Sequence, residues 1–98
     1  MPRYCFKVKN AKEVIKKLDT ISWKFTKSPF YPYEYSGYYP IFDEAGFQYN
    51  VPYLVKAFKN SICIYLNKRD IPSWARWMAE DILDGIYYEV CSYLGIKP

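Results

Sequence analysis

Apolar residues alternate with cysteine or lysine near the start of the chain: Tyr4, Phe6 and Val8 against Cys5, Lys7 and Lys9. Successive side chains of a strand point to opposite faces, so this alternation predicts a half-buried strand over residues 4–9. A second alternation, in which Ile21, Trp23 and Phe25 are separated by polar residues, predicts a strand over residues 21–26.

The residues between these two alternations have helical spacing. Apolar side chains recur at i, i+3, i+4 and i+7, at Ala11, Val14, Ile15 and Leu18, and lysines occupy the other side. We expect Asn10 to cap this helix, with Glu13 completing a capping box, and Asp19-Thr20 to end it. Residues 4–26 are therefore predicted to form a strand–helix–strand unit with a basic outer face.

Residues 27–50 contain three prolines and two glycines, which interrupt any regular period. We expect a long segment that is irregular but ordered, because loops of this length in a small domain usually have a function or form a small core of their own. The alternative is a hairpin that pairs residues 31–35 with residues 38–42 and turns at Ser36-Gly37.

The pattern over residues 51–59 fits two structures. Val51, Leu54, Val55 and Phe58 have helical spacing, with Asn50 as a cap and Pro52 in the first turn, and this favours a helix. The same residues also fit the first arm of a hairpin that turns at residues 59–61. Residues 62–66 are rich in β-branched residues and predict a strand.

The longest periodic segment covers residues 74–94. Its apolar stripe consists of Trp74, Trp77, Met78, Ile82, Ile86, Val90, Tyr93 and Leu94. Asp70 or Ser73 is expected to cap the helix, and Gly95 suits the left-handed position after its last turn. Gly85, in the middle of the helix, is either tolerated there or marks a close contact.

These elements predict a single α+β domain. We expect a sheet of three to five short, mostly antiparallel strands, with the short basic helix and the long C-terminal helix packed on one face. The predicted core comprises Phe6, Val8, Val14, Ile15, Leu18, Trp23, Phe25, Leu54, Phe58, Ile62, Ile64, Leu66, Trp77, Met78, Ile82, Ile86 and Val90.

The composition narrows the class of protein. No apolar run reaches the roughly 20 residues of a membrane helix, and the charged start lacks the apolar region of a secretory signal, so no membrane contact is expected. Cys5, Cys63 and Cys91 are odd in number and far apart, which favours buried, reduced thiols in a cytoplasmic protein. A Cys5–Cys63 bridge between neighbouring strands is the alternative.

Catalysis is not expected from this sequence. Histidine, the commonest general base at neutral pH, is absent, and no glycine-rich phosphate loop is present. Glu80, Asp81 and Asp84 could hold Mg²⁺, but they lie on the polar side of the last helix, where solvated charge is usual. We therefore expect a binding protein with no cofactor, no metal and no small-molecule substrate.

Charge is distributed in blocks along the chain. The formal net charge of +4 combines +6 over residues 1–27, −3 over residues 28–55, +4 over residues 56–69 and −3 over residues 70–98. Lysines concentrate in the strand–helix–strand unit, at Lys7, Lys9, Lys12, Lys16, Lys17, Lys24 and Lys27. Lysines on one face would contact phosphates without sequence preference, so DNA or RNA is the first predicted partner.

A second prediction comes from tyrosine. Residues 30–53 hold seven tyrosines and three phenylalanines, and no lysine or arginine. Aromatic side chains without lysine are typical of the centre of a protein interface. Protein binding or homodimerisation is therefore predicted through Tyr31, Tyr33, Tyr35, Tyr38 and Tyr39, unless these rings instead complete the core over the sheet. The composition, rich in Lys, Tyr and Ile and lacking His, resembles that of small proteins from viruses of thermophilic archaea, which favours binding to a host factor or a genome.

Overall fold

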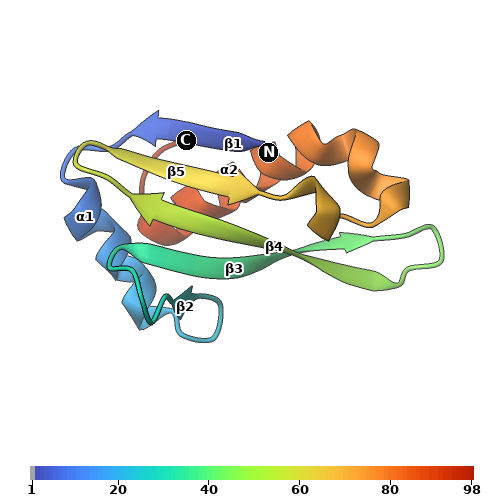
Figure 1. Ribbon diagram of the computed structural model, residues 1–98, viewed down its shortest axis with the longest axis horizontal. Helices are drawn as coiled ribbons and strands as arrows, with labels where there is room; N and C mark the ends of the chain where they lie inside the picture. The colour runs from blue at the N-terminus through green and yellow to red at the C-terminus, as the bar shows by residue number, and fades with distance from the viewer. Residues whose placement is uncertain (1) are drawn as a thin grey trace.

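An antiparallel five-stranded sheet forms the framework of the protein (Figure 1), and the computed structural model describes residues 2–98. The strands are β1 (Arg3–Lys7), β2 (Thr26–Lys27), β3 (Glu34–Phe42), β4 (Gln48–Ala57) and β5 (Ser61–Leu66). Their order across the sheet is β1-β5-β4-β3-β2, so β1 and β2 lie at opposite edges.

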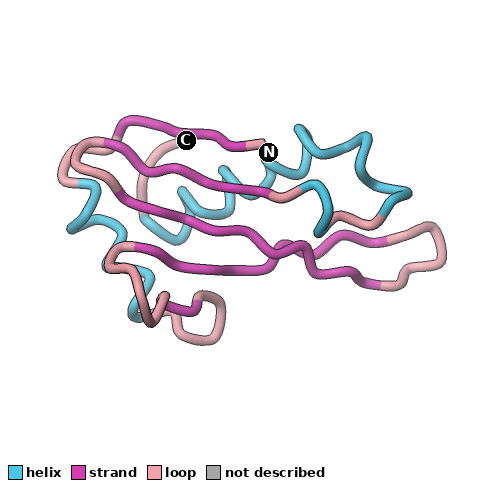
Figure 2. The backbone as a smooth tube through the Cα atoms, viewed as in Figure 1, coloured by secondary structure: helices cyan, strands magenta, loops and turns pink. Residues whose placement is uncertain are grey.

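The helical segments are α1 (Ala11–Val14) with the 3₁₀ turns of η1 (Ile15–Thr20), then η2 (Lys68–Asp70), η3 (Ser73–Met78) and α2 (Ala79–Leu94). The α1–η1 segment and α2 pack together on one face of the sheet, and η3 contacts α2 (Figures 1 and 2). The predicted α+β class is confirmed, with η3 and α2 together forming a C-terminal helical segment of 22 residues. Within residues 2–98, no helix has both the length and the apolar character needed to cross a membrane.

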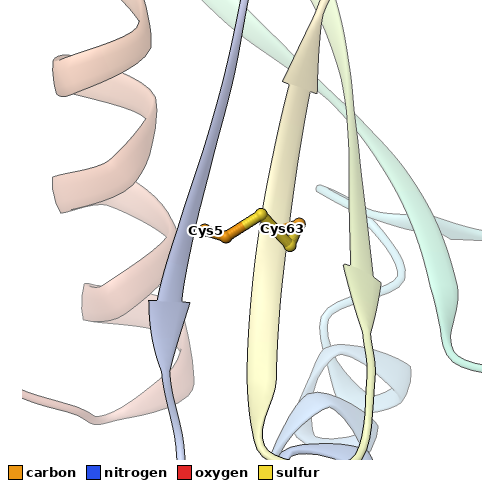
Figure 3. The surroundings of a disulfide bond; sticks show 2 residues. All are labelled: Cys5 and Cys63. Carbon is orange, nitrogen blue, oxygen red and sulfur yellow. A yellow bond between two sulfur atoms is a disulfide. The ribbon is translucent and has the colours of Figure 1, made fainter.

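Edge strand β1 is covalently joined to β5. Cys5 pairs directly with Cys63 in the register of the two strands, and a disulfide connects them (Figure 3). The expectation of three reduced thiols was therefore wrong for these two cysteines, because the strand register brings them face to face. Cys91 is a free, buried thiol on α2.

The predicted strand over residues 21–26 was wrong except at its end. The amide groups of Lys24 and Phe25 both donate to the carbonyl of Ile21, which curls the backbone into a turn. Only Thr26 and Lys27 pair with β3. Phe25 is buried as predicted, but Trp23 on the turn is 78% exposed.

Two predictions were wrong, the irregular segment over residues 27–50 and the helix favoured over residues 51–59. Most of these residues form the long β3–β4 hairpin. Ser36-Gly37 lies within β3, and the chain turns instead at residues 43–47, where Phe47 N–H donates to Asp43 Oδ1 over 2.9 Å. Pro40 lies where β3 is an edge strand, and Pro52 where β4 has lost β5 as a neighbour. Prolines are tolerated at such positions because a missing N–H leaves no ladder bond unmade.

The core lies between the sheet and the helices. Four side chains predicted to be buried are exposed instead: Trp23, Leu54, Phe58 and Trp77. Leu54 and Phe58 were placed inside on the assumption of a helix, whereas strand alternation buries Val51, Tyr53, Val55 and Ala57. Trp77 lies on the outer side of η3, whose buried residue is Ala75.

The helix boundaries also differ from the prediction. Asn10 adopts a left-handed conformation with φ 55° and forms no side-chain cap; its carbonyl oxygen accepts the amides of Glu13 and Val14. Neither Asp70 nor Ser73 caps the C-terminal helix, since Pro72 precedes η3. Gly95 ends α2 in the left-handed conformation, as predicted.

Candidate functional site

The β3–β4 hairpin projects beyond the rest of the sheet. β5 pairs with β4 only from Tyr53 to Ala57, and β2 pairs with β3 only at Tyr35 and Ser36. Residues 38–42 and 48–52 consequently pair only with each other and form a twisted two-stranded arm, which extends to one end of the molecule (Figures 1 and 2).

The 3₁₀ segment η3 is held beside this arm. Ala75 and the preceding Ile71 are buried and anchor η3 to the core. The Arg76 guanidinium donates from Nε to the carbonyl oxygens of Lys68 and Ile71, at 3.2 and 3.1 Å, and so fixes the connection from η2. An edge-to-face contact between the rings of Tyr49 and Trp74, 5.6 Å between centroids, joins η3 to the arm.

A groove of about 590 Å³ lies between the arm and η3. Its lining consists of Phe42, Asp43, Glu44, Ala45, Trp74, Trp77 and Met78. Trp77 is 79% exposed and Phe42 is 59% exposed, while Phe47 is also exposed at the arm's turn. A cluster of large exposed aromatic rings is uncommon on ordinary surface and often marks an interaction site.

A hydrogen bond orients one of the exposed rings of the groove. The Trp77 indole Nε1 donates to the Trp74 carbonyl oxygen over 3.0 Å, which fixes the ring while leaving its faces accessible. Two carboxylates, Asp43 and Glu44, lie at the arm side of the same groove. Aromatic faces beside carboxylates can receive an apolar side chain together with a neighbouring cation, through burial, cation–π contact and ion pairing.

The seven predicted nucleic-acid-binding lysines are distributed over both edges of the sheet and the α1–η1 segment. Lys7 and Lys9 lie at the β1 edge, Lys12, Lys16 and Lys17 on α1 and η1, and Lys24 and Lys27 at the β2 edge.

Several of these lysines also have partners within the protein. Lys24 Nζ lies 3.1 Å from Glu89 Oε1 and donates to the Tyr38 carbonyl oxygen. Lys17 donates to the carbonyl oxygen of Leu94. DNA or RNA binding stays a prediction, with a less continuous basic surface than the sequence indicated.

The five predicted partner-binding tyrosines have different environments. Tyr31 and Tyr38 are exposed, whereas Tyr33 and Tyr39 pack against the core. Tyr35 is buried, and its hydroxyl donates to Asp19 Oδ1 over 2.6 Å. Burial, followed by the hydrogen bond and the charge of Asp19, raises the pKa of the Tyr35 phenol. Tyr35 therefore contributes to the core and is unavailable to a partner.

The groove residues were missed because the sequence pattern assigned Trp74 and Trp77 to the buried stripe of the last helix. Their register changes at Met78, where η3 gives way to α2. One signal was available: Phe42, Phe47 and Tyr49 flank the turn formed by Asp43 to Gly46, as aromatics on the tip of a hairpin would.

The carboxylates Glu80, Asp81 and Asp84 lie on the exposed side of α2. No group of three metal-ligating side chains is found among residues 2–98. Comparison of the chain with protein-family models, with curated proteins and with solved structures finds no match.

Proposed function

We propose that this protein is a non-catalytic module that binds a protein segment in the groove between the β3–β4 arm and η3. The observation that carries the proposal is the exposure of Trp77 and Phe42 around a groove that also presents Asp43 and Glu44. The partner segment would insert an apolar side chain between the rings and place lysine or arginine opposite the carboxylates.

The energetics favour such a partner over a purely charged one. A fully buried aromatic ring gains about 1.5–3 kcal/mol from leaving water. Exposed ion pairs add about 0–1 kcal/mol each and are weakened by salt. Affinity would therefore come from Trp77 and Phe42, while Asp43 and Glu44 would select basic segments and raise the association rate.

Selection from a library of short displayed random peptides tests this function. We expect enriched peptides to combine an aromatic or large aliphatic residue with a neighbouring lysine or arginine. Replacement Trp77→Ala should weaken their binding at least tenfold, which corresponds to loss of an anchor residue. Trp23→Ala is the matched control, because Trp23 has nearly the same exposure but lies on the turn before β2 and not in the groove lining.

Either of two results would remove this function from consideration. One is selection that yields no peptide whose binding depends on Trp77. The other is equal loss of binding in the Trp77→Ala and Trp23→Ala proteins while both remain folded, which would show that binding does not depend specifically on the groove.

A second candidate function is nucleic-acid binding. It is favoured by a hollow of about 370 Å³ whose lining includes the lysines Lys7, Lys9 and Lys97 and the aromatic residues Phe6 and Tyr87. Labelled single- and double-stranded DNA should then bind at low salt, and Lys7→Glu with Lys9→Glu should weaken binding and flatten its salt dependence. Absence of binding at low salt would eliminate this candidate.

The cytoplasmic location predicted from the sequence conflicts with the Cys5–Cys63 bridge, since disulfides persist chiefly in oxidising compartments. Alkylation of thiols at the moment of cell lysis tests the location. Reduced Cys5 and Cys63 would support a cytoplasmic location, and an intact bridge would contradict it.

A further inference from the structure

The two ends of the molecule differ in chemistry. The molecule is elongated, with extents of 41 × 25 × 24 Å, and the aromatic groove with its carboxylates lies at the end formed by the arm. β4 runs from that end to the other, where it reaches the turn before β5, formed by Phe58, Lys59 and Asn60 (Figure 1).

This turn carries an apolar side chain among lysines. Phe58 is 45% exposed, and Lys59 beside it is also exposed. The amide of Val8 donates to the Asn60 carbonyl oxygen over 3.0 Å, which holds Lys7 and Lys9 next to the turn. Lys7, Lys9 and Lys59 take part in none of the ion pairs formed within residues 2–98.

We propose that the turn Phe58–Asn60 of one copy of this chain docks in the aromatic groove of a second copy. Phe58 would enter between Phe42 and Trp77, and the lysines around it would face Asp43 and Glu44. The inference rests on the proposed function, because it names a second copy of the chain as the partner whose basic, apolar segment the groove binds.

The geometry makes this contact head-to-tail. The donor turn and the receiving groove lie at opposite ends of the long axis, so two docked copies leave one groove and one turn unoccupied. Interfaces of this kind produce open chains or closed rings rather than two-fold dimers. Charged groups at both surfaces make the association sensitive to salt.

Sedimentation velocity of the wild type and two variants tests the inference. Phe58→Ser disables the turn and Trp77→Ala disables the groove, and both change exposed side chains. We expect the wild type to form species larger than a dimer as concentration rises at low salt, and each variant alone to be a monomer. Equal amounts of the two variants should form a dimer that grows no further, since one functional turn then meets one functional groove.

Trp23→Ala should associate like the wild type, which controls for the general loss of an exposed indole. A wild type that remains monomeric at high concentration would overturn self-association. So would a mixture of variants that shows no dimer, because a head-to-tail contact requires complementation. Binding of DNA to the Phe58 turn without self-association would likewise overturn it.

The inference and the proposed function fail in different ways. Peptides that bind the groove in a Trp77-dependent manner, combined with a monomeric wild type, leave the proposed function standing and remove the second copy as partner. Absence of both peptide binding and self-association removes both.

Discussion

Two tyrosine hydroxyls are held inside the protein by carboxylates. Tyr35 donates to Asp19, and Tyr53 donates to Glu89 Oε2 over 3.2 Å, while Lys24 neutralises Glu89 from the other side. Burial raises the pKa of both phenols, and the adjacent carboxylates raise it further. Each ring thus contributes apolar area to the core and a satisfied hydrogen bond at its rim.

These two phenols predict loss of stability in alkali. Because their pKa is higher in the folded protein than in the unfolded chain, the unfolded chain releases these protons first, above a pH of about 10. The free energy of unfolding should therefore be constant with respect to these groups below that pH and fall by up to about 1.4 kcal/mol per pH unit for each group above it.

Urea unfolding at a series of alkaline pH values measures this fall, and Tyr53→Phe should make it shallower. A fall of the same steepness in the Tyr53→Phe protein would show that Tyr53 does not cause it. Phenolate absorbance gives a second measurement. The two buried rings should ionise only as the protein unfolds.

Gly85 lies in close contact with the Tyr39 side chain. A Cβ atom at position 85 would approach the Tyr39 hydroxyl and lie 2.8 Å from the ring carbon Cζ. Gly85→Ala should therefore lower the free energy of unfolding by about 1–2 kcal/mol, because the cost of overpacking exceeds the gain in helix propensity of about 1 kcal/mol. In a Tyr39→Ala background the same change should instead be neutral or stabilising. Thermal or urea unfolding of the four proteins measures both effects, and a loss that persists without the Tyr39 ring would contradict this explanation.

Among the elements, β1 is held to the sheet by a covalent bond in addition to its ladder with β5. It is an edge strand of five residues, and the Cys5–Cys63 disulfide closes a loop of 58 residues between β1 and β5. Replacing both cysteines by serine should lower the free energy of unfolding by about 4 kcal/mol, chiefly because the unfolded chain regains conformational freedom. Urea unfolding with and without reductant measures the loss. Cys91→Ala, which removes the free thiol, should retain the response to reductant; an unchanged stability of the double serine variant would contradict the assignment.

The spacing of apolar residues was sufficient to predict an element wherever that spacing fits only a helix or only a strand. β1, β5, the α1–η1 segment and α2 were all predicted, since each has a single consistent apolar face. Residues 51–57 fit both periods: Val51 and Val55 face inward in either a helix or a strand. The choice is made by pairing with β3, a partner more than ten residues away, which local spacing cannot reveal.

The candidate site was predicted only in part, for a related reason. The aromatic segment 30–53 was predicted to bind a partner, and Phe42 of this segment lines the groove. None of the five tyrosines predicted as its contacts, Tyr31, Tyr33, Tyr35, Tyr38 and Tyr39, is in the lining. The other wall of the groove consists of Trp74 and Trp77, which were predicted to lie in the buried stripe of the helix because tryptophan is usually buried. Their exposure follows from small residues, Ala75 and Ala79, taking the inward positions of η3 and the start of α2.

At the scale of the whole molecule, the groove with Asp43 and Glu44 and the Phe58 turn with its lysines lie at opposite ends of the long axis. They are separated because β4 carries the chain from the turn at residues 43–47 to the lysines around Phe58. Binding through the groove should consequently weaken with salt, yet retain the contribution from Trp77 and Phe42 when charges are screened.

The fluorescence of Trp74 and Trp77 tests the groove most directly. Trp23→Phe leaves these two as the remaining tryptophans, and both line the groove. Titration of this variant with a peptide obtained from the display selection should shift the emission to shorter wavelength and saturate at the dissociation constant measured from a label on the peptide. Saturation of the label with no change in tryptophan emission would place the bound peptide elsewhere and contradict the groove as the binding surface.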